Sequence, residues 1–218
     1  MVRLIIYLLI LNILIAGCRE KESSLFTLMP SGKTGIEFSN DIVETEANNI
    51  MTYQYMYNGA GVALGDVNND GLSDIYFAGN SVSNKLYLNK GDWKFEDVTD
   101  QMNLSGRTGD WKTGVSMVDI NGDGWLDIYV CYSGNVENEG IGSPVQKDRP
   151  ERANQLFINN GAEDGALPAF TDRAKEYGLD AVGTFSSQSY FFDYDKDGDL
   201  DMFLVNHANM FYSPFFNT

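Results

Sequence analysis

The chain has 218 residues and is strongly acidic, with 31 Asp and Glu against 15 Lys and Arg and a formal net charge of −16. This balance argues against nucleic acid as a partner and against anionic membranes, because like charges repel each other. A chain of this length buries a sizeable core. The acids therefore serve either solubility or cation binding, and their distribution decides between the two.

The N-terminus has the plan of a bacterial export signal. Arg3 precedes an apolar run, Leu4 to Ala16, that ends in small residues and Cys18. The run is short for a membrane span and predicts a signal peptide over residues 1–17. The stretch LIAGC resembles a lipobox, which implies cleavage before Cys18, lipidation of its thiol and anchoring to the cell envelope, at the outer membrane. The alternatives are an ordinary signal peptide and an uncleaved anchor.

Cysteine usage agrees with a lipidated Cys18. Only Cys131 would then be left, so no intramolecular disulfide is available despite the exported context. Cys131 follows the run DIYV and is most simply a small apolar strand residue. Stability must therefore come from a hydrophobic core, from a bound metal or from both.

Residues 18–57 form a tether and a leader segment before the repeats begin. The charged run REKESS predicts a mobile tether, and LFTLMPSGKTGIEFSN, Leu25 to Asn40, is expected to pack beside the first repeat. The run PSGKTG invites interpretation as a phosphate-binding loop. Thr27 stands where that pattern has its first glycine, so we reject this interpretation.

One acidic pattern, D-x-[DN]-x-D-G-x-x-D, occurs three times: DVNNDGLSD from Asp66, DINGDGWLD from Asp119 and DYDKDGDLD from Asp193. Its apolar flanks recur with it, as GVALGD before the first loop and GVSMVD before the second. A further module follows the first two loops, NKLYLN from Asn84 and NQLFIN from Asn154. This self-similarity predicts a repeat protein, with repeat 1 at 58–109, repeat 2 at 110–182 and an incomplete repeat 3 at 183–218.

The spacing within each loop fits calcium coordination. Positions 1, 3 and 5 offer side-chain oxygens, the glycine at position 6 permits a sharp turn, and position 9 adds a carboxylate. Two carboxylates about 4 Å apart repel by roughly 4 kcal/mol at an effective dielectric of about 20, and a divalent cation turns this repulsion into attraction. Donors that are all oxygen favour Ca²⁺ over zinc or copper. The predicted ligands are Asp66, Asn68, Asp70, Asp74, Asp119, Asn121, Asp123, Asp127, Asp193, Asp195, Asp197 and Asp201.

The loops differ from those of an EF-hand. An EF-hand needs an acid at position 12 and helices on both sides, but position 12 is Phe77, Val130 or Leu204 and the flanks are β-branched and aromatic. Such flanks predict strands, which rejects the EF-hand. The loops could also be acidic turns that serve solubility alone, but such turns do not require acids at positions 1, 5 and 9 in all three loops.

The loops and their flanks resemble the FG-GAP / VCBS repeat family, whose blades also build the integrin α-chain propeller. The resemblance covers Asn58 to the C-terminus. Within the family, the runs LFTLMPSGKTGIEFSN, YNGAGVALGDVNNDGLSD and NQLFINN are similar to bacterial lipoproteins related to cartilage acidic protein. The resemblance implies a calcium-binding β-propeller, which in such proteins is often longer and followed by a further domain.

The residues themselves predict the same all-β fold, a partial β-propeller. Each full repeat offers about four short strands, which make one propeller blade. The third repeat stops after its second strand, DMFLVN, and a ring needs about 4–8 blades. We therefore expect an amino-terminal fragment of a longer protein. An engineered piece and one part of an assembled ring are the alternatives.

No group of residues predicts catalysis, so we expect no enzyme activity. His207 is the single histidine and has no partner that the sequence can place. No serine lies in a nucleophile elbow, and Cys131 has no basic neighbour. The aromatic clusters at 53–57, 189–192 and 210–216 are expected to pack in the core, with a carbohydrate or protein contact surface as the alternative.

The sequence thus predicts an exported, lipid-anchored, calcium-binding propeller segment that acts as a binding or adhesion module. The expected partners are the membrane, through the lipid on Cys18, and an extracellular protein or glycan bound by loops such as the insertion at Asn135 to Arg152. The expected calcium Kd is about 10⁻⁴–10⁻³ M. The alternative is a scaffold within a larger extracytoplasmic carbohydrate-active enzyme.

Overall fold

The computed structural model describes residues 24–46, 49–51, 53–107, 111–134, 149–163 and 165–207. The predicted signal peptide, Cys18, most of the insertion at Asn135 to Arg152 and the aromatic cluster at 210–216 lie outside these residues. No helix within the described ranges is long and apolar enough to cross a membrane. The chain divides into two compact units, Met1–Pro30 and Ser31–Thr218, and every strand belongs to the second.

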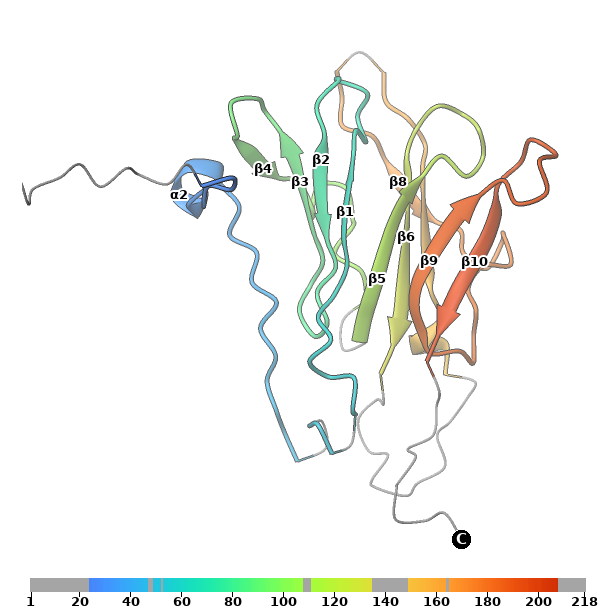
Figure 1. Ribbon diagram of the computed structural model, residues 1–218. Coiled ribbons are helices and arrows are strands. Elements are labelled where there is room, and N and C mark those ends of the chain that lie inside the picture. The colour runs from blue at the N-terminus through green and yellow to red at the C-terminus, as the bar shows by residue number, and fades with distance from the viewer. Residues whose placement is uncertain are drawn as a thin grey trace, which may run out of the picture. The chain divides into compact units, whose positions relative to one another are not determined.

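The second unit is almost entirely β, as predicted (Figure 1). Its first sheet is an antiparallel meander of β1 (Val62–Gly65), β2 (Asp74–Phe77), β3 (Lys85–Asn89) and β4 (Phe95–Asp97). Its second repeats this order with β5 (Trp111–Val118), β6 (Asp127–Ser133), β7 (Gln155–Asn159) and β8 (Phe170–Asp172). Its third is the hairpin of β9 (Ser186–Phe192) and β10 (Asp201–Asn206). Within the described residues, the helical turns are α2 (Ser31–Thr34) and a 3-10 turn at Pro150–Arg152. Four-stranded meanders in series are the units of a β-propeller, and we call each sheet a blade.

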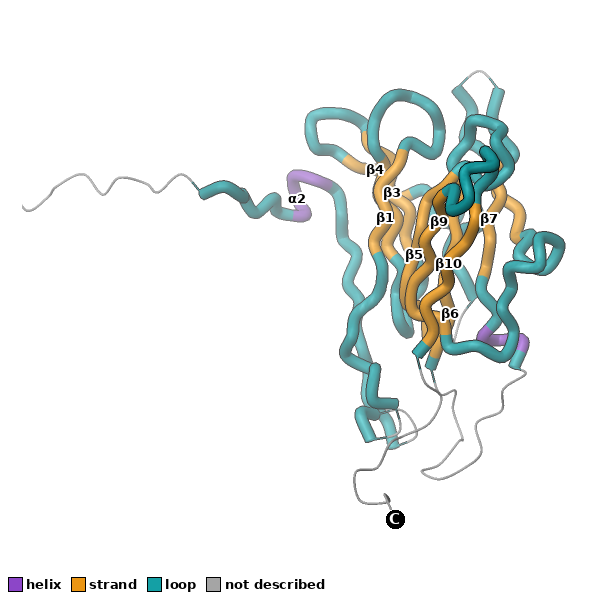
Figure 2. The backbone as a smooth tube through the Cα atoms, turned by 45° about the vertical axis from the view of Figure 1, so that its right-hand side comes forward, coloured by secondary structure: helices purple, strands orange, loops and turns teal. Residues whose placement is uncertain are grey.

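The blades are joined through their first strands, β1, β5 and β9, which lie side by side (Figure 2). The amide of Gly61 donates to the carbonyl of Thr113 at 2.5 Å, and the Thr113 hydroxyl donates to the carbonyl of Ser186 at 2.7 Å. Gly114 permits the close approach of β5 to β9, since a Cβ there would lie 2.5 Å from the carbonyl oxygen of Ser187. The recurring glycine before each of the first two loops thus serves contact between blades.

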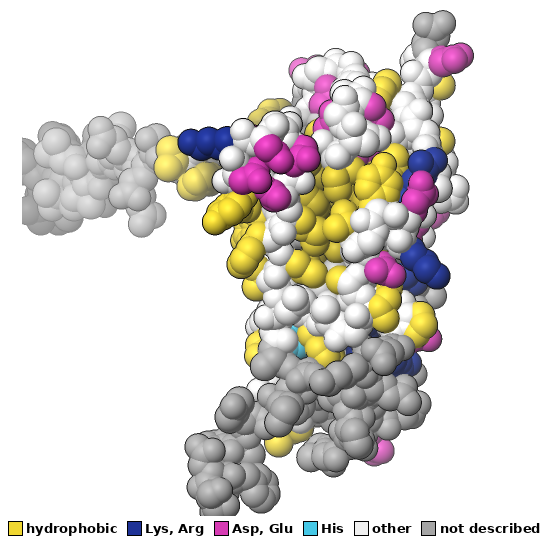
Figure 3. Space-filling model, turned by 90° about the vertical axis from the view of Figure 1, so that its right-hand side faces the viewer, with side chains coloured by type: hydrophobic (Ala, Val, Ile, Leu, Met, Phe, Trp, Pro, Cys, Tyr) yellow, Lys and Arg dark blue, Asp and Glu magenta, His cyan; other side chains and the backbone are white. Residues whose placement is uncertain are grey.

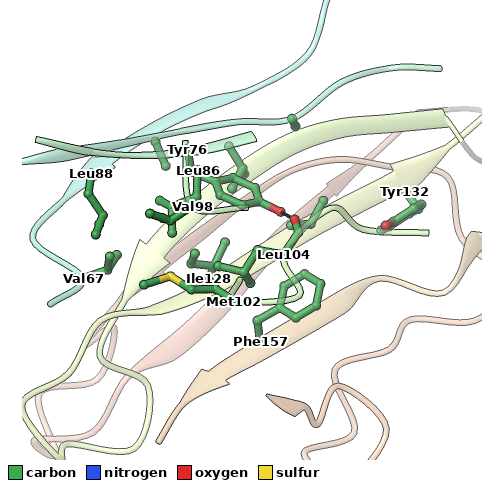
Figure 4. Close-up of a cluster of buried hydrophobic side chains, with 14 residues drawn as sticks. Val67, Tyr76, Leu86, Leu88, Val98, Met102, Leu104, Ile128, Tyr132 and Phe157 are labelled. Atoms are coloured by element: carbon green, nitrogen blue, oxygen red, sulfur yellow. Dashed lines mark hydrogen bonds between the residues drawn. The ribbon is translucent and has the colours of Figure 1, made fainter. Parts of the chain in front are cut away.

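Two apolar layers separate the three blades. Between the first and second blades, side chains such as Tyr76, Leu86 and Leu88 pack against Ile128 and Val130 (Figure 4). Between the second and third, a layer contains Tyr129, Cys131, Leu156 and Ile158, with Phe191, Met202 and Leu204 packed against it. Successive side chains of a strand point to opposite faces, so β6 serves both layers and all of its residues are buried. Burial raises the pKa of the Cys131 thiol to about 12, which suits the inert strand residue predicted from the sequence.

The part of the leader that belongs to the second unit packs against the first blade, whereas Leu25, Phe26 and Leu28 of the same stretch are exposed. Phe38 stacks on Phe77 with ring centroids 4.8 Å apart, and the amide of Glu37 donates to the Tyr87 hydroxyl at 3.3 Å. The leader therefore covers part of the face of the first blade that points away from the second. Val62 and Leu64 on that face are left exposed.

Candidate functional site

Each of the three acidic loops connects the first two strands of a blade. The loops span 66–74, 119–127 and 193–201, and strands flank all three. This arrangement confirms that they are not EF-hands, which need flanking helices. The first two loops are also in contact, because the Asn69 side chain donates to the carbonyl of Gly124 at 3.1 Å.

The first and second loops have nearly the same internal hydrogen bonds. In the first, one oxygen of Asp66 accepts from the amide of Asp70 at 3.1 Å and the other from the amide of Gly71 at 2.7 Å. In the second, Asp119 accepts from the amides of Asp123 and Gly124 at 3.1 and 2.8 Å. These bonds wind the backbone of each loop around the carboxylate at position 1.

The side chains at positions 3 and 5 point into the same turn. The amide group of Asn68 donates to the Asp70 carboxylate at 3.0 Å, and that of Asn121 donates to Asp123 at 2.8 Å. The glycine at position 6 has φ of 85° in the first loop, 87° in the second and 97° in the third. Such values lie in the left-handed region that favours glycine, which explains why this position is the same in all three repeats.

Position 9 has a structural role that the spacing alone did not reveal. Asp74 is fully buried, and its two oxygens accept from the amides of Val67 at 3.0 Å and Asn89 at 2.8 Å. Asp127 is fully buried as well and accepts from Ile120 and Asn159 at 3.0 and 2.8 Å. Asn89 is the last residue of β3 and Asn159 is the last residue of β7. Each closing carboxylate therefore links its loop to the third strand of its own blade.

Burial raises the pKa of both closing carboxylates. It raises the pKa of Asp74 to about 6, against the lowering effect of the two backbone hydrogen bonds, and it raises the pKa of Asp127 for the same reason. The nearby acids at positions 1 and 5 raise both values further. A cation in the loop would favour the ionised form. Because a carboxylate has about four lone-pair positions, accepting two amides leaves it able to bind an ion.

The third loop differs from the other two in its number of carboxylates and in how closely it is packed. Oxygens of Asp193, Asp195 and Asp197 all lie within 4.8 Å of one another, and all three residues are exposed. Asp201 accepts from the amide of Tyr194 at 2.8 Å but is only partly buried, since no third strand of this blade lies within the described residues. This loop therefore has one more carboxylate at its centre than the other two and less packing around it.

The donors of all three loops fit calcium by their chemistry. Each loop offers carboxylate oxygens at positions 1, 5 and 9, with an amide oxygen at position 3 in the first two and a carboxylate in the third. Hard oxygen donors in a turn suit Ca²⁺, while the softer metals prefer thiolate or imidazole. The one candidate group of three carboxylates within the described part of the chain belongs to the third loop.

His207 has a partner that the sequence could not identify. Its Nε2 lies within hydrogen-bond distance of the Ser133 hydroxyl, and its ring lies 4.2 Å from the ring of Tyr55 and 5.2 Å from that of Phe185. Ser133 is fully buried, so its hydroxyl is closed to a substrate. The pair positions His207 among aromatic rings at the ends of the blades opposite the acidic loops.

Comparisons with known proteins agree with the repeats. Residues 66–130 match the family model described as FG-GAP-like repeat. The chain is also similar to integrin alpha-4 of Xenopus laevis, with 29% identity over 164 residues. That match covers 67% of this chain but 14% of the integrin chain.

Proposed function

Because this chain carries FG-GAP-like repeats folded as propeller blades, we propose that it is a calcium-binding propeller segment of the binding or adhesion type. The observation that supports calcium most directly is the shared geometry of the loops, in which acids converge around a glycine turn. The similarity to integrin alpha-4 supports a binding module and extracellular protein as one class of partner. The relationship to bacterial lipoproteins stays a prediction.

In the proposed sites, positions 1, 3, 5 and 9 of each loop hold the ion. Bound Ca²⁺ would cancel the repulsion among carboxylates that the turn forces together. Asp74 and Asp127 would then link an ordered loop to the third strand of the blade, because their oxygens also accept from Asn89 and Asn159. Calcium would in this way stabilise whole blades and the loops together.

Thermal unfolding of the mature protein with calcium and with excess chelator tests the proposal. Tenfold excess of ion over Kd should add about 1.4 kcal/mol of stability for each occupied site, and we expect the midpoint to rise by several degrees. Magnesium is the control, since it prefers a smaller and more rigid shell. A cooperative transition that is the same with calcium and with chelator would mean that the loops are only acidic turns.

We also propose export and lipid anchoring through Cys18, on the motif LIAGC. The change Cys18→Ser should abolish incorporation of labelled fatty acid and release the protein from the membrane fraction. The matched control is Cys131→Ser, because Cys131 is buried within β6. Fatty-acid labelling that persists in Cys18→Ser would overturn the lipobox assignment.

We infer that a further blade covers the third blade in the intact ring. Tyr190, Phe192 and Phe203 are 54%, 46% and 59% exposed and lie on the face of β9 and β10 that points away from the second blade. Figure 3 shows this apolar surface. An apolar sheet face of this kind normally packs against another layer. The alternative function, a scaffold for a carbohydrate-active enzyme, would place its catalytic groups beyond the residues described.

A further inference from the structure

A hollow of about 290 Å³ lies at the ends of the first strands, opposite the acidic loops. Its lining comes from three blades and from the leader. Tyr53, Tyr55 and His207 form one wall, Asn58, Thr113, Ser187 and Gln188 contribute polar groups, and Gly59, Ala60, Gly61 and Gly114 leave backbone accessible. The hollow thus exists only because the blades meet there.

The aromatic wall is held in place by a small core of its own. Met56 and Tyr53 are almost fully buried in a cluster with Trp111, and the rings of Tyr53 and Trp111 meet edge to face at 5.4 Å. This cluster fixes the turn that carries Tyr55. Tyr55 in turn lies against His207, with ring centroids 4.2 Å apart and ring planes tilted by 33°, and the Ser133 hydroxyl positions His207. A wall whose rings are already fixed loses little freedom on binding a ligand.

Among the described residues, those that line the hollow include no Asp, Glu, Lys or Arg, although the chain has 31 acids and 15 basic residues. Its polar groups are carboxamides, hydroxyls, backbone amides and the imidazole of His207, which donate and accept hydrogen bonds. Apart from this imidazole, which lies against the Ser133 hydroxyl, the lining offers an ionic ligand no countercharge. A ligand with many hydroxyl groups and a flat apolar face fits both the aromatic wall and the neutral polar groups.

We propose that this hollow binds one ring of a neutral saccharide, with its C–H face against Tyr55 and its hydroxyls bonded to Asn58 and Gln188. The inference rests on the proposed binding function and names its ligand class. The volume of about 290 Å³ lies just below the roughly 300–1,000 Å³ range of ligand pockets, which limits the bound unit to about one ring. A quaternary ammonium fits less well, because it needs aromatic faces that surround it, whereas the rings of Tyr53, Tyr55 and His207 belong to one wall of the hollow.

The experiment titrates the mature protein, in calcium, with neutral monosaccharides and their short oligomers, using calorimetry and saturation-transfer NMR. We expect Tyr55→Ala to weaken binding at least tenfold. Asn58→Ala is the second variant, because Asn58 is exposed and its truncation leaves the core intact. The matched control is Tyr57→Ala. Tyr57 is a tyrosine two positions away, 57% exposed against 36% for Tyr55, and it does not line the hollow.

Loss of affinity in Tyr55→Ala and Asn58→Ala, with affinity retained in Tyr57→Ala, supports the site. Saccharide binding that is unchanged in both variants would place the ligand elsewhere and overturn the site, while the proposed binding function stands. No binding by any neutral saccharide, or binding of choline in its place, would overturn the ligand class. The calcium effect on thermal unfolding is measured on the same samples, so that failure of the calcium sites is distinguished from failure of the saccharide site.

Discussion

The second and third blades show how one sequence pattern has two structural outcomes. Tyr129 and Phe203 each lie two residues after the closing aspartate of their loop, and both point toward the next blade. Tyr129 is fully buried because the third blade covers it, whereas Phe203 is 59% exposed. Burial in a repeat protein therefore depends on the neighbouring repeat as much as on the residue itself.

The largest effect on the free energy of unfolding is expected for Tyr129, which the third blade covers. Tyr129 packs edge to face with Phe191 at 5.6 Å, and its hydroxyl donates to the carbonyl of Leu179 at 2.6 Å. Tyr129→Ala should lower the free energy of unfolding by about 3–5 kcal/mol, since it leaves a cavity between the second and third blades. Urea denaturation measures this loss. A loss below about 1 kcal/mol would show that the third blade is not packed on the second.

A smaller effect is expected for the buried asparagine of the second blade. Asn154 accepts from the amide of Tyr132 at 2.8 Å and donates to the hydroxyls of Tyr129 and Ser186 at 2.8 and 2.9 Å. Asn154→Ala removes the acceptor of the buried Tyr132 amide and one hydrogen bond from each of the two hydroxyls. We expect this to cost about 1–3 kcal/mol in the free energy of unfolding. Urea denaturation measures this cost as well.

Asn84→Ala is the matched change in the first blade. Asn84 accepts from the amide of Gly79 and donates to the Tyr76 hydroxyl, as Asn154 does to Tyr129. Ser186 lies on β9, so only Asn154→Ala should also increase hydrogen exchange in the third blade. Equal exchange in both variants would contradict this link between blades.

Removal of calcium should affect the third blade more than the second. The third loop has a carboxylate at position 3, Asp195, where the second has Asn121. Asp195→Asn should weaken calcium at that loop by roughly tenfold, because charge count sets affinity in such sites. The reciprocal change is Asn121→Asp. Calorimetry measures both, and hydrogen exchange with chelator should show β9 and β10 opening first. If β5 and β6 opened as early as β9 and β10, the prediction that calcium removal affects the third blade more than the second would be wrong.

The smallest effect on the free energy of unfolding is expected for Phe203, which is exposed. Phe203→Ala should change the free energy of unfolding of this chain by less than about 0.5 kcal/mol, as for most surface substitutions. The same substitution in a protein that contains the next blade should cost as much as Tyr129→Ala. A loss above about 2 kcal/mol in this chain would mean that its third blade is already covered.

Much of the fold follows from local patterns. The β-branched and aromatic flanks predicted strands, the repeats predicted blades, and the glycine at position 6 predicted a sharp turn, which all three loops adopt with a left-handed glycine. These features depend on residues close together in the chain, so one repeat carries enough information. Calcium binding at the loops stays a prediction, because the ligand positions agree with it in chemistry alone.

The features that the sequence did not reveal all depend on distant residues. Asp74 is tied to Asn89 and Asp127 to Asn159 across a blade, and Ser133 positions His207 across 74 positions of the chain. The repetition of Asn84 with Asn154, and of Asn89 with Asn159, was the sequence signal that pointed to such polar contacts.

The sequence by itself determined where the strands turn and how the repeats are spaced. Only the tertiary structure decided which face of a strand is core, which asparagines are buried and where a hollow forms. The reason is physical: backbone turns and side-chain alternation are set by neighbours in the chain, whereas burial is set by the layer that packs against them. The position shared by Tyr129 and Phe203 shows this, being covered in one blade and exposed in the next.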